Sequence, residues 1–366
     1  MAAEKSLRVG VLVLVSILWL GFSGMISWGG VESKSPSPVY MIPFFGLPDR
    51  AELCGEPVPL QNADVRERFD REFTIITHGH AQVYLWLKRM ERYFPYLEKQ
   101  LASKGLPDDF KYIAVAESDL TTTAVSPAGA AGPWQFMAGT ACNFGINQSG
   151  SVDERFDFEI AGSGAFNYLK SLHNTFQNWT LSIAAYNCGA KRVQDEIRKQ
   201  KVNNYYQLRL PLETERYIFR ILAIKEVLSK PEKYGYYLPK GAGYTPVAVE
   251  KVSISVPGPI AITAAADAAG ITYREMKVLN PCLISEIIPK GNSTIKVPEG
   301  KGKEFEKGIA AWKAEYKPVI VMHKVAKGET IDGIAHQYNA TRQEICDWNQ
   351  LKDSKIRLGQ TLKIQK

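Results

Sequence analysis

The chain has 366 residues, of which 45% are hydrophobic and 23% are charged. This length predicts about two to four domains, and the composition excludes a wholly disordered chain. A net charge of +7 favours polyanionic partners such as nucleic acid or a membrane surface, but no basic run or arginine-rich helix concentrates it, which argues against a nucleic-acid-binding protein.

The N-terminus has the pattern of an export signal. Lys5 and Arg8 precede a segment that carries no charge from Val9 to Val31. Such a segment is either a cleaved signal peptide or a membrane anchor, and its length, sufficient to cross a bilayer, favours the anchor. We therefore assign residues 1–31 to this signal, expect a Pro/Ser-rich spacer at 32–64, and infer that the protein works outside the cytoplasm.

Residues 65–238 are expected to form an all-α domain, because apolar residues recur there at helical spacing. Pro95 is expected to divide one helical segment into two, and Pro211 to open the last long helix. Two stripes mark the faces that we expect to be buried: Ala161, Ala165, Tyr168, Leu169, Leu172 and Phe176 form one, and Tyr217, Ile218, Ile221, Lys225 and Leu228 form the other.

A glutamate ends the most apolar of these segments. In "LPDDFKYIAVAE", Pro107 is expected in the first turn of a helix. Phe110, Ile113 and Ala114 then share one face, and the next position on that face is Glu117. Burial near a helix C-terminus favours the neutral form of a carboxyl group. The helix alone is compatible with a buried structural carboxylate that has a basic partner and with a catalytic acid.

Groups suited to ligand binding follow in the loop that runs from Ser126 to Phe136. Its glycines allow a ligand to approach the backbone closely, and the side chains of Ser126 and Gln135 offer hydrogen bonds. Trp134 and Phe136 offer apolar faces on which sugar rings stack. Packing in the core is the structural alternative for Trp134.

Four further polar residues lie beyond this loop. Tyr186 and Asn187 end the apolar segment "LSIAAYN", and Glu213 and Tyr217 are four apart on one helix face. Each has a structural alternative, because a tyrosine can belong to the core, Asn187 can cap a helix, and Glu213 can be a favourable first-turn charge.

Two copies of a βααβ pattern follow the helical domain. Five residues recur at a constant offset, since Val256, Ala266, Thr272, Glu275 and Asn280 return as Val325, Ala335, Thr341, Glu344 and Asn349. Each Thr–Glu pair predicts a capping box at the start of the second helix. We expect small α+β modules at 250–299 and 320–366, joined by a charged linker at 300–319.

Cysteine and histidine spacing indicates no metal centre. The five cysteines include no CxxC pair, and the five histidines include no HExxH. One or two disulfides are compatible with an exported chain, but the spacing does not pair the cysteines. We therefore expect neither a metal nor a cofactor.

Five blocks between about Arg66 and Gly235 resemble the lytic transglycosylases of bacterial cell walls, in the goose-lysozyme-like superfamily. They occur in the order of that family: "AESDL", "SPAGAAGPWQFMAGTACNFG", "DERFDFEIAGSGAFNYL", "AAYNCG" and "LPLETERY". The repeats resemble LysM modules, and the first copy is degenerate at its opening "ISVPGPIAI". The whole arrangement resembles the membrane-bound lytic murein transglycosylase D group.

The resemblance implies a multidomain protein with an all-α lysozyme-like catalytic domain, at 65–238, followed by two small LysM-like α+β modules. It implies that Glu117 is the single catalytic acid and base. It assigns contacts with the substrate to Ser126, Gln135, Met137, Tyr186, Asn187, Glu213 and Tyr217.

The implied partners are the N-acetylglucosamine-containing glycan strands of peptidoglycan, and the membrane if the N-terminal segment is uncleaved. The implied location is the bacterial cell envelope, in the periplasm or anchored to its membrane.

The pattern of carboxylates fits chemistry that needs only one of them. Most glycosidases place two carboxyl groups around the scissile bond, but Asp119, two residues along the helix from Glu117, is expected on the opposite face. A protonated glutamate can donate to the leaving oxygen and then accept the proton of the sugar's own C6 hydroxyl, whose attack on C1 closes a 1,6-anhydro ring. A hydrolytic muramidase of the same fold and a non-catalytic peptidoglycan-binding protein are the alternatives.

Overall fold

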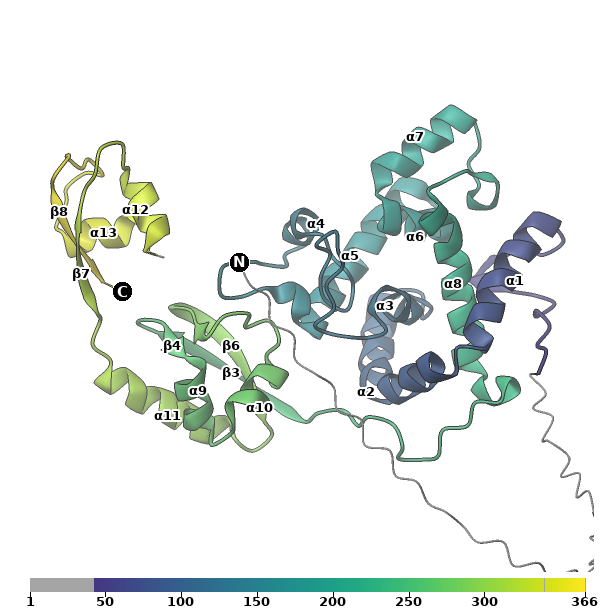
Figure 1. Ribbon diagram of the computed structural model, residues 1–366, viewed down its shortest axis with the longest axis horizontal. Coiled ribbons are helices and arrows are strands. Elements are labelled where there is room, and N and C mark those ends of the chain that lie inside the picture. Colours follow the sequence, from purple (N-terminus) through teal and green to yellow (C-terminus); the bar gives the residue numbers. More distant parts are fainter. Residues whose placement is uncertain (1–42, 339, 366) are drawn as a thin grey trace, which may run out of the picture. The chain divides into compact units, whose positions relative to one another are not determined.

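The computed structural model describes residues 43–338 and 340–365 of the chain (Figure 1). The predicted signal or anchor and the first part of the predicted spacer therefore lie outside the described residues. Within the described ranges, a helical domain is followed by two small modules that each contain an antiparallel strand pair. No helix in these ranges is both long and apolar enough to cross a membrane.

The helical domain is all-α apart from one short hairpin, as the sequence predicts. Its elements are β1 (Glu52–Leu53), β2 (Glu56–Pro57), α1 (Ala63–Thr77), α2 (His80–Lys104), α3 (Phe110–Ser118), α4 (Ala138–Asn143), α5 (Phe158–Phe176), α6 (Trp179–Cys188), α7 (Ala190–Gln200) and α8 (Leu212–Ser229). Three short 3₁₀ turns connect some of them, at Glu154–Phe156, Tyr205–Gln207 and Pro231–Tyr234.

Helix α8 lies at the centre of this domain and packs against α1, α3 and α6 (Figure 1). Ile218, Phe219, Ile221 and Leu222 are all buried, so the helix is covered on several sides. Lys225, which interrupts the predicted apolar stripe, directs its ammonium group to Asp109, with 2.7 Å between Nζ and Oδ2. Because this helix carries Glu213 and Tyr217, the core of the domain fixes their positions.

The prediction that Pro95 divides a helical segment is wrong. Helix α2 continues through this proline from His80 to Lys104. Proline lacks the N–H that would bond to the carbonyl four residues earlier, which costs stability in a helix interior. The side chains of Phe94 and Leu97 on either side are buried in the core, and this tertiary packing offsets the local cost.

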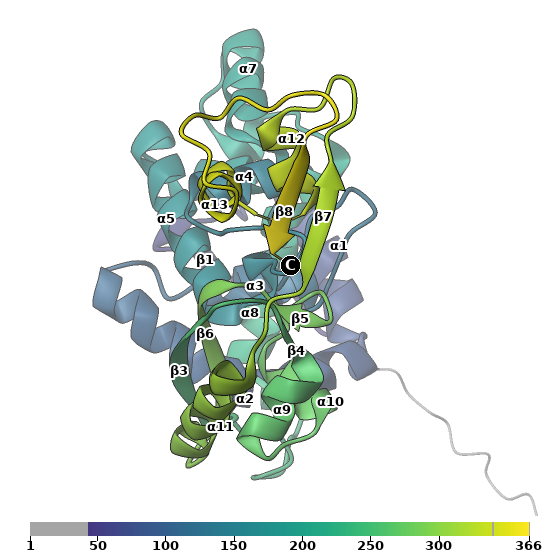
Figure 2. The same cartoon turned by 90° about the vertical axis from the view of Figure 1, so that its left-hand side faces the viewer.

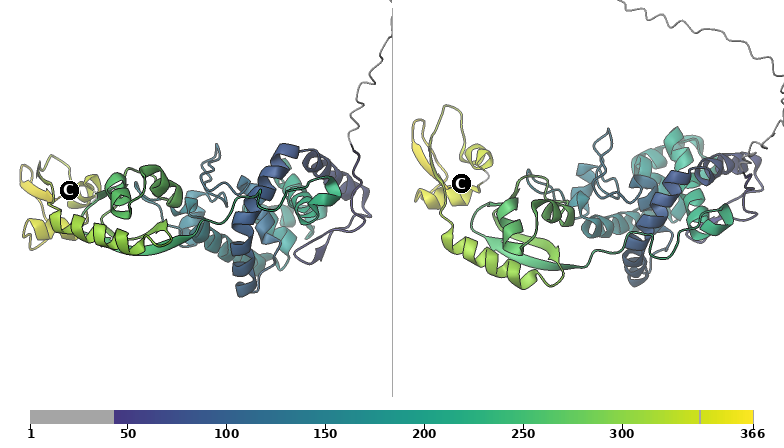
Figure 3. Two further views of the ribbon diagram at one scale, coloured as in Figure 1. Left: turned by 90° about the horizontal axis from the view of Figure 1, so that it is seen from below. Right: turned by 60° about the horizontal axis from the view of Figure 1, so that its bottom comes forward.

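The first module is built on the strand pair β3 (Val249–Val256) and β6 (Gly291–Pro298), which run antiparallel with Val252 opposite Ile295. Between them lie β4 (Ile260–Ala261), α9 (Ile262–Ala269), α10 (Tyr273–Leu279) and β5 (Ile287–Ile288). The segment expected to be a linker contains α11 (Gly302–Glu315), which packs against α9 and β3 (Figure 3). Because Phe305 and Ile309 of α11 are buried in the core of this module, we include the helix in the first module.

The second module repeats the strand–helix–helix–strand order of the first, without counterparts of β4, β5 and α11 among the described residues, and has a core of its own. Strands β7 (Ile320–Lys324) and β8 (Thr361–Gln365) pair antiparallel and pack with α12 (Ile331–Gln337) and α13 (Arg342–Trp348) (Figure 2). Both predicted capping boxes are present, at the starts of α10 and α13.

The repeated asparagine has the same structural role in both modules. Asn280 donates to the carbonyl oxygen of Lys296 at 2.8 Å and accepts from the Lys296 N–H at 2.8 Å. Asn349 makes the same pair of bonds with Lys363, at 2.8 and 2.6 Å. Each asparagine therefore joins the end of the second helix to the last strand.

The first module contacts the helical domain through backbone and side chains. The Asp153 N–H donates to the carbonyl of Cys282 at 2.8 Å, and the Ile284 N–H donates to the carbonyl of Ser151 at 3.0 Å. Beside this backbone pairing, Nζ of Lys296 lies 2.7 Å from Oδ2 of the buried Asp157.

Candidate active site

Glu117 lies in the last turn of α3, close to its C-terminal end. Helix α3 begins at Phe110, so Pro107 precedes the helix instead of standing in its first turn as predicted. The side chain of Glu117 is half-buried, and its Oε1 accepts a hydrogen bond from the hydroxyl of Tyr217 on α8. The packing of α3 against α8 brings these two polar groups together from distant parts of the chain.

The surroundings of Glu117 raise the pKa of its carboxyl group to about 7. Loss of hydration on burial is the largest cause, and the negative charge of Glu213 acts in the same direction. The hydrogen bond from Tyr217 and the positive charge of Arg220 oppose the rise. A carboxyl group with this pKa is protonated in an appreciable fraction of molecules at neutral pH, which suits a general acid that must next act as a base.

Tyr186 of α6 lies in the same region as Glu117. Its hydroxyl donates to the carbonyl oxygen of Trp134 at 2.7 Å, which connects the end of α6 to the loop. Burial, and after it the charge of Glu117, raises the pKa of Tyr186 well above its usual range, so this phenol stays neutral and remains a donor.

Trp134 and Phe136 do not offer faces for sugar stacking, contrary to the expectation from sequence. Both side chains are buried, and the ring of Trp134 packs edge-on against Phe166. The structural alternative therefore holds for Trp134. Met137, the next residue along, is exposed, as is Val125 earlier in the loop between α3 and α4.

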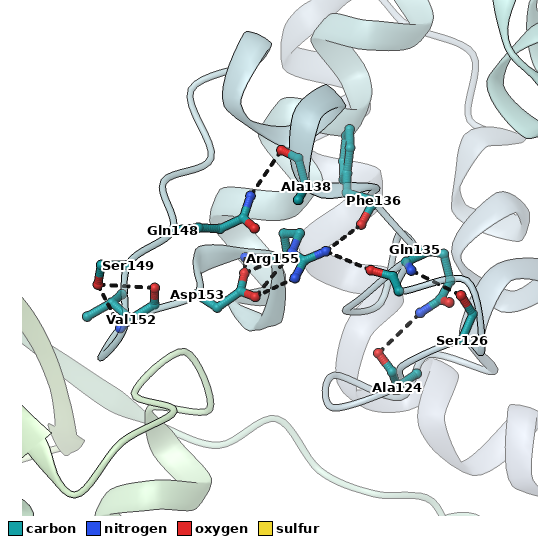
Figure 4. A network of polar contacts seen from close by, with 12 residues as sticks. Ala124, Ser126, Gln135, Phe136, Ala138, Gln148, Ser149, Val152, Asp153 and Arg155 are labelled. Carbon is teal, nitrogen blue, oxygen red and sulfur yellow. Dashed lines mark hydrogen bonds and ion pairs between the residues drawn. The ribbon is translucent and has the colours of Figure 1, made fainter.

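The loop between α3 and α4 is held in shape by its own side chains and by Arg155. Oγ of Ser126 accepts from the Ala130 N–H at 3.0 Å, and Nε2 of Gln135 donates to the carbonyl of Gly132 at 2.8 Å. The same Nε2 also donates to the carbonyl of Ala124 at 3.2 Å (Figure 4). Arg155 donates to the carbonyls of Gly129 and Phe136, at 2.9 and 3.0 Å.

Two backbone positions show why this loop needs particular residues. At Gly132, where φ is +80°, an added Cβ would lie 1.7 Å from the carbonyl oxygen of Arg155, so any side chain would force the loop away from Arg155. Gln135 adopts a left-handed φ of 47°, which its side-chain bonds within the loop support. The end of α3 is also tied to this loop, because Oγ of Ser118 donates to the carbonyl of Pro133 at 2.9 Å.

Asn187 and Glu213 are placed at the facing ends of α6 and α8. Oδ1 of Asn187 accepts from the hydroxyl of Thr214 at 2.6 Å, while the cap of α6 is Gly189. Glu213 is exposed in the first turn of α8, near enough for its charge to raise the pKa of Glu117.

Asp119, the nearest carboxylate in sequence, is engaged elsewhere. It follows the end of α3 with a left-handed φ of 57°. Its Oδ1 accepts from the indole N–H of Trp86 at 2.8 Å, and its backbone carbonyl accepts from Arg89 at 2.9 Å. Among the described residues, no group of three His, Cys, Asp or Glu side chains is arranged to hold a metal ion, and the five cysteines are free.

Arg155 and Arg220 were not singled out by the sequence. Arg155 lies within the block "DERFDF", whose acidic residues gave no sign that the arginine would bind backbone carbonyls of a distant loop. Arg220 stands three residues after Tyr217, and this spacing, which places both on one side of a helix, was the available signal.

Comparison with known proteins gives three domain matches. The transglycosylase SLT domain matches residues 95–208. The lytic transglycosylase MltD LysM-like domain matches residues 250–313, a range that includes most of α11, and the LysM domain matches residues 323–365.

Two relatives align with parts of the chain. Over 292 residues the chain is 27% identical to membrane-bound lytic murein transglycosylase D of Escherichia coli strain K12, covering 75% of this chain and 64% of that protein. It is 32% identical over 123 residues to a putative tributyltin chloride resistance protein of Alteromonas sp. strain M-1, covering 32% of this chain and 59% of the relative. The chain thus spans somewhat less than two thirds of the length of both.

Two solved structures of lytic transglycosylases align with parts of the chain. The 70 kDa soluble lytic transglycosylase Slt70 of Escherichia coli aligns at 23% identity with a TM-score of 0.34, over 46% of this chain and 29% of its own. An inactive mutant of Slt from Pseudomonas aeruginosa aligns at 23% identity with a TM-score of 0.32, over 41% and 26%.

Proposed function

We propose that this chain, which its SLT and MltD-type LysM domains make an MltD-like lytic transglycosylase by family, cleaves the glycan strands of peptidoglycan between N-acetylmuramic acid and N-acetylglucosamine. The observation that carries the proposal is the Glu117 carboxyl group, which accepts from Tyr217 and has a pKa of about 7. One group that is protonated and deprotonated with similar ease can serve both halves of the reaction.

In the first half, protonated Glu117 donates its proton to the glycosidic oxygen as the bond from that oxygen to C1 of the muramic acid breaks. In the second half, the resulting carboxylate accepts the proton of the C6 hydroxyl while that oxygen bonds to C1. The product is a 1,6-anhydro ring, and no water is consumed. The attacking hydroxyl belongs to the substrate, so its high effective molarity makes a second catalytic carboxylate unnecessary.

We assign roles to the surrounding residues, and their contacts support these assignments. Tyr217 orients the carboxyl group of Glu117 by donating to Oε1. Ser126, Gln135 and Met137 shape the loop face beside the scissile bond. Tyr186, Asn187 and Glu213 line the same region from α6 and α8, and their remaining hydrogen-bonding capacity is directed to the sugars.

We further propose that the LysM module at 320–366 binds the N-acetylglucosamine-containing strands, and that the protein acts in the cell envelope during wall turnover. The relative named as membrane-bound supports this location, with residues 1–31 as signal peptide or anchor. Binding by a module on the same chain raises the local concentration of polymer near Glu117.

Mass spectrometry of the products released from purified sacculi tests the reaction. A transglycosylase leaves 1,6-anhydro ends, whereas a hydrolytic muramidase leaves reducing ends that are heavier by one water. We expect anhydro ends throughout. A product mixture consisting of reducing ends would assign water as the nucleophile, and intact sacculi after incubation with folded protein would point to a non-catalytic binding protein.

A further inference from the structure

A buried carboxylate, Glu72, lies in α1, outside the range matched by the SLT domain. It stands on an apolar stripe with Phe69, Phe73 and Ile76, and the residue is 2% exposed. A charge in that position requires partners, because an unpaired buried carboxylate is costly.

Three arginines supply the partners of Glu72. Nε of Arg216 lies 2.7 Å from Oε1, and Nη1 of Arg71 lies 2.5 Å from the same oxygen. Nε of Arg220 lies 3.9 Å from Oε2. Arg216 and Arg220 stand one turn apart on α8, so Glu72 connects α1 to the helix that carries Tyr217.

Arg220 also acts on Glu117. The charged and titratable groups that influence Glu117 are Tyr217, Glu213 and Arg220, all from α8, and Tyr186 of α6 is electrostatically coupled to it. Of these, Arg220 is the cation, and its field favours the ionised form of Glu117. A general acid must be protonated at the start of the reaction, so an uncompensated cation beside it is unfavourable for activity at neutral pH.

We propose that Glu72 is a positioning residue of the active site, which fixes the guanidinium groups of Arg216 and Arg220 and offsets part of the charge that Arg220 presents to Glu117. The inference rests on the proposed role of Glu117 as the acid. Through Arg220, Glu72 keeps Glu117 protonated to a higher pH than the arginine alone would allow. A merely structural ion pair between α1 and α8 would contribute stability and leave the titration of Glu117 unchanged.

The first test is the titration of Glu117 in the full chain without substrate. Carboxyl ¹³C resonances of a protein labelled at glutamate are followed against pH, and the Glu117 resonance is identified by its loss in Glu117→Gln. In Glu72→Gln, which preserves size and an acceptor for Arg216, we expect the midpoint to move to lower pH. An unchanged midpoint in a folded Glu72→Gln protein would overturn the proposal.

The second test is the pH profile of kcat/KM on soluble glycan strands. Because the protonated form of Glu117 is active, its ionisation sets the alkaline limb, and Glu72→Gln should move this limb to lower pH. At pH 8 we expect kcat/KM of Glu72→Gln to fall by about threefold beyond any fall at pH 5. This magnitude is typical of one partly screened charge. A loss equal at both pH values would mean that Glu72 acts only on the fold.

Two further variants complete the design. Arg220→Gln should move the Glu117 midpoint in the opposite direction, to higher pH. This variant tests the proposal even if Glu72→Gln does not fold. The double variant Glu72→Gln/Arg220→Gln should return the midpoint towards that of the parent. A failure of Arg220→Gln to raise the midpoint would remove the proposed route from Glu72 to Glu117.

Asp109 provides the matched control. It pairs with Lys225 of α8 at 2.7 Å and is also largely buried, but its cation, unlike Arg220, is not among the groups that shift the pKa of Glu117. Asp109→Asn should lower thermal stability and leave the midpoint of the Glu117 titration unchanged. If this variant shifts the midpoint as much as Glu72→Gln does, the effect of Glu72 is explained by loosening of α8. If the parent cleaves without anhydro ends, the proposed function fails while the titration still tests the link between Glu72 and Glu117.

Discussion

Tyr217 donates a hydrogen bond to the carboxyl group of Glu117 across a separation of 100 positions in the chain. Such a donor favours the ionised carboxylate, whereas burial favours the neutral acid. Burial is the larger effect, since the pKa of Glu117 is raised to about 7. The hydrogen bond therefore orients the acid without preventing its protonation.

Replacing Tyr217 by Phe should raise the pKa of Glu117 further, because the interaction that favours the carboxylate is lost. The alkaline limb of kcat/KM should move to higher pH. Below pH 6 activity should fall by about fivefold, the effect of losing one orienting hydrogen bond of about 1 kcal/mol. The pH profile on soluble glycan strands measures both effects. A limb that moved to lower pH would contradict this account of the pair.

Tyr234 offers a control of the same chemistry in the same domain. Its hydroxyl donates to Oε1 of Glu226 at 2.7 Å. Tyr234→Phe deletes an equivalent Tyr–Glu hydrogen bond, so its pH profile should match that of the parent. Any shift common to both variants would reflect general loosening of α8.

Replacing Glu117 by Gln should abolish cleavage, because the amide can neither donate the proton nor recover it. General acid–base catalysis contributes roughly 10²- to 10⁴-fold, so residual turnover should fall by at least that factor. The measurement is release of muropeptides from sacculi, with sedimentation of bound protein to establish that wall binding persists. Near-parental turnover would remove Glu117 from the role of acid.

The same variant should alter the pH dependence of stability. A pKa raised from 4.5 to about 7 in the folded state stabilises the fold fully below pH 4.5, and this contribution is lost as the pH rises through about 7. Glu117→Gln has no such loss. Its free energy of unfolding, relative to that of the parent, should therefore increase by up to about 3 kcal/mol between pH 4 and pH 8. Thermal melts of both proteins across this range measure the difference. Parallel curves would mean that the carboxyl group is well hydrated in the fold.

Sequence patterns predicted the features that arise from local periodicity. The helical spacing of apolar residues predicted that Glu117 shares a face with them. The Thr–Glu spacings predicted both capping boxes. The same pattern is present at Glu72, which follows Phe69 at helical spacing.

What could not be predicted depends on contacts between distant segments. Burial of Trp134 comes from α5 closing over the loop, so a residue suited to stacking on sugar became part of the core. Helix α11 joined the first module because Phe305 and Ile309 meet that module's core. Helix α2 continued through Pro95 because tertiary packing outweighed a local rule.

Replacing Glu213 by Gln should reduce activity moderately and change its pH dependence. The charge of Glu213 helps to raise the pKa of Glu117, so its removal should move the alkaline limb to lower pH.

Replacing Asp119 by Asn should have a mild effect on activity, since the amide oxygen still accepts from Trp86. Product analysis should find 1,6-anhydro ends from both variants. Reducing ends that the parent releases and that either variant no longer releases would identify the replaced residue as a base for water.

A chain that ends after Tyr316 should separate binding from cleavage. This cut lies after α11 and removes only the second module, whose core of Val325, Ile334, Ile345 and Leu362 is its own. The first module keeps its backbone bonds to the helical domain at Asp153 and Ser151. We expect near-parental rates on short soluble strands and slower release from intact sacculi, because the tethered binding site no longer raises the local concentration of polymer. Parental rates on both substrates would mean that the second module adds no affinity for the wall. Loss of activity on soluble strands would mean that the second module helps to build the active site.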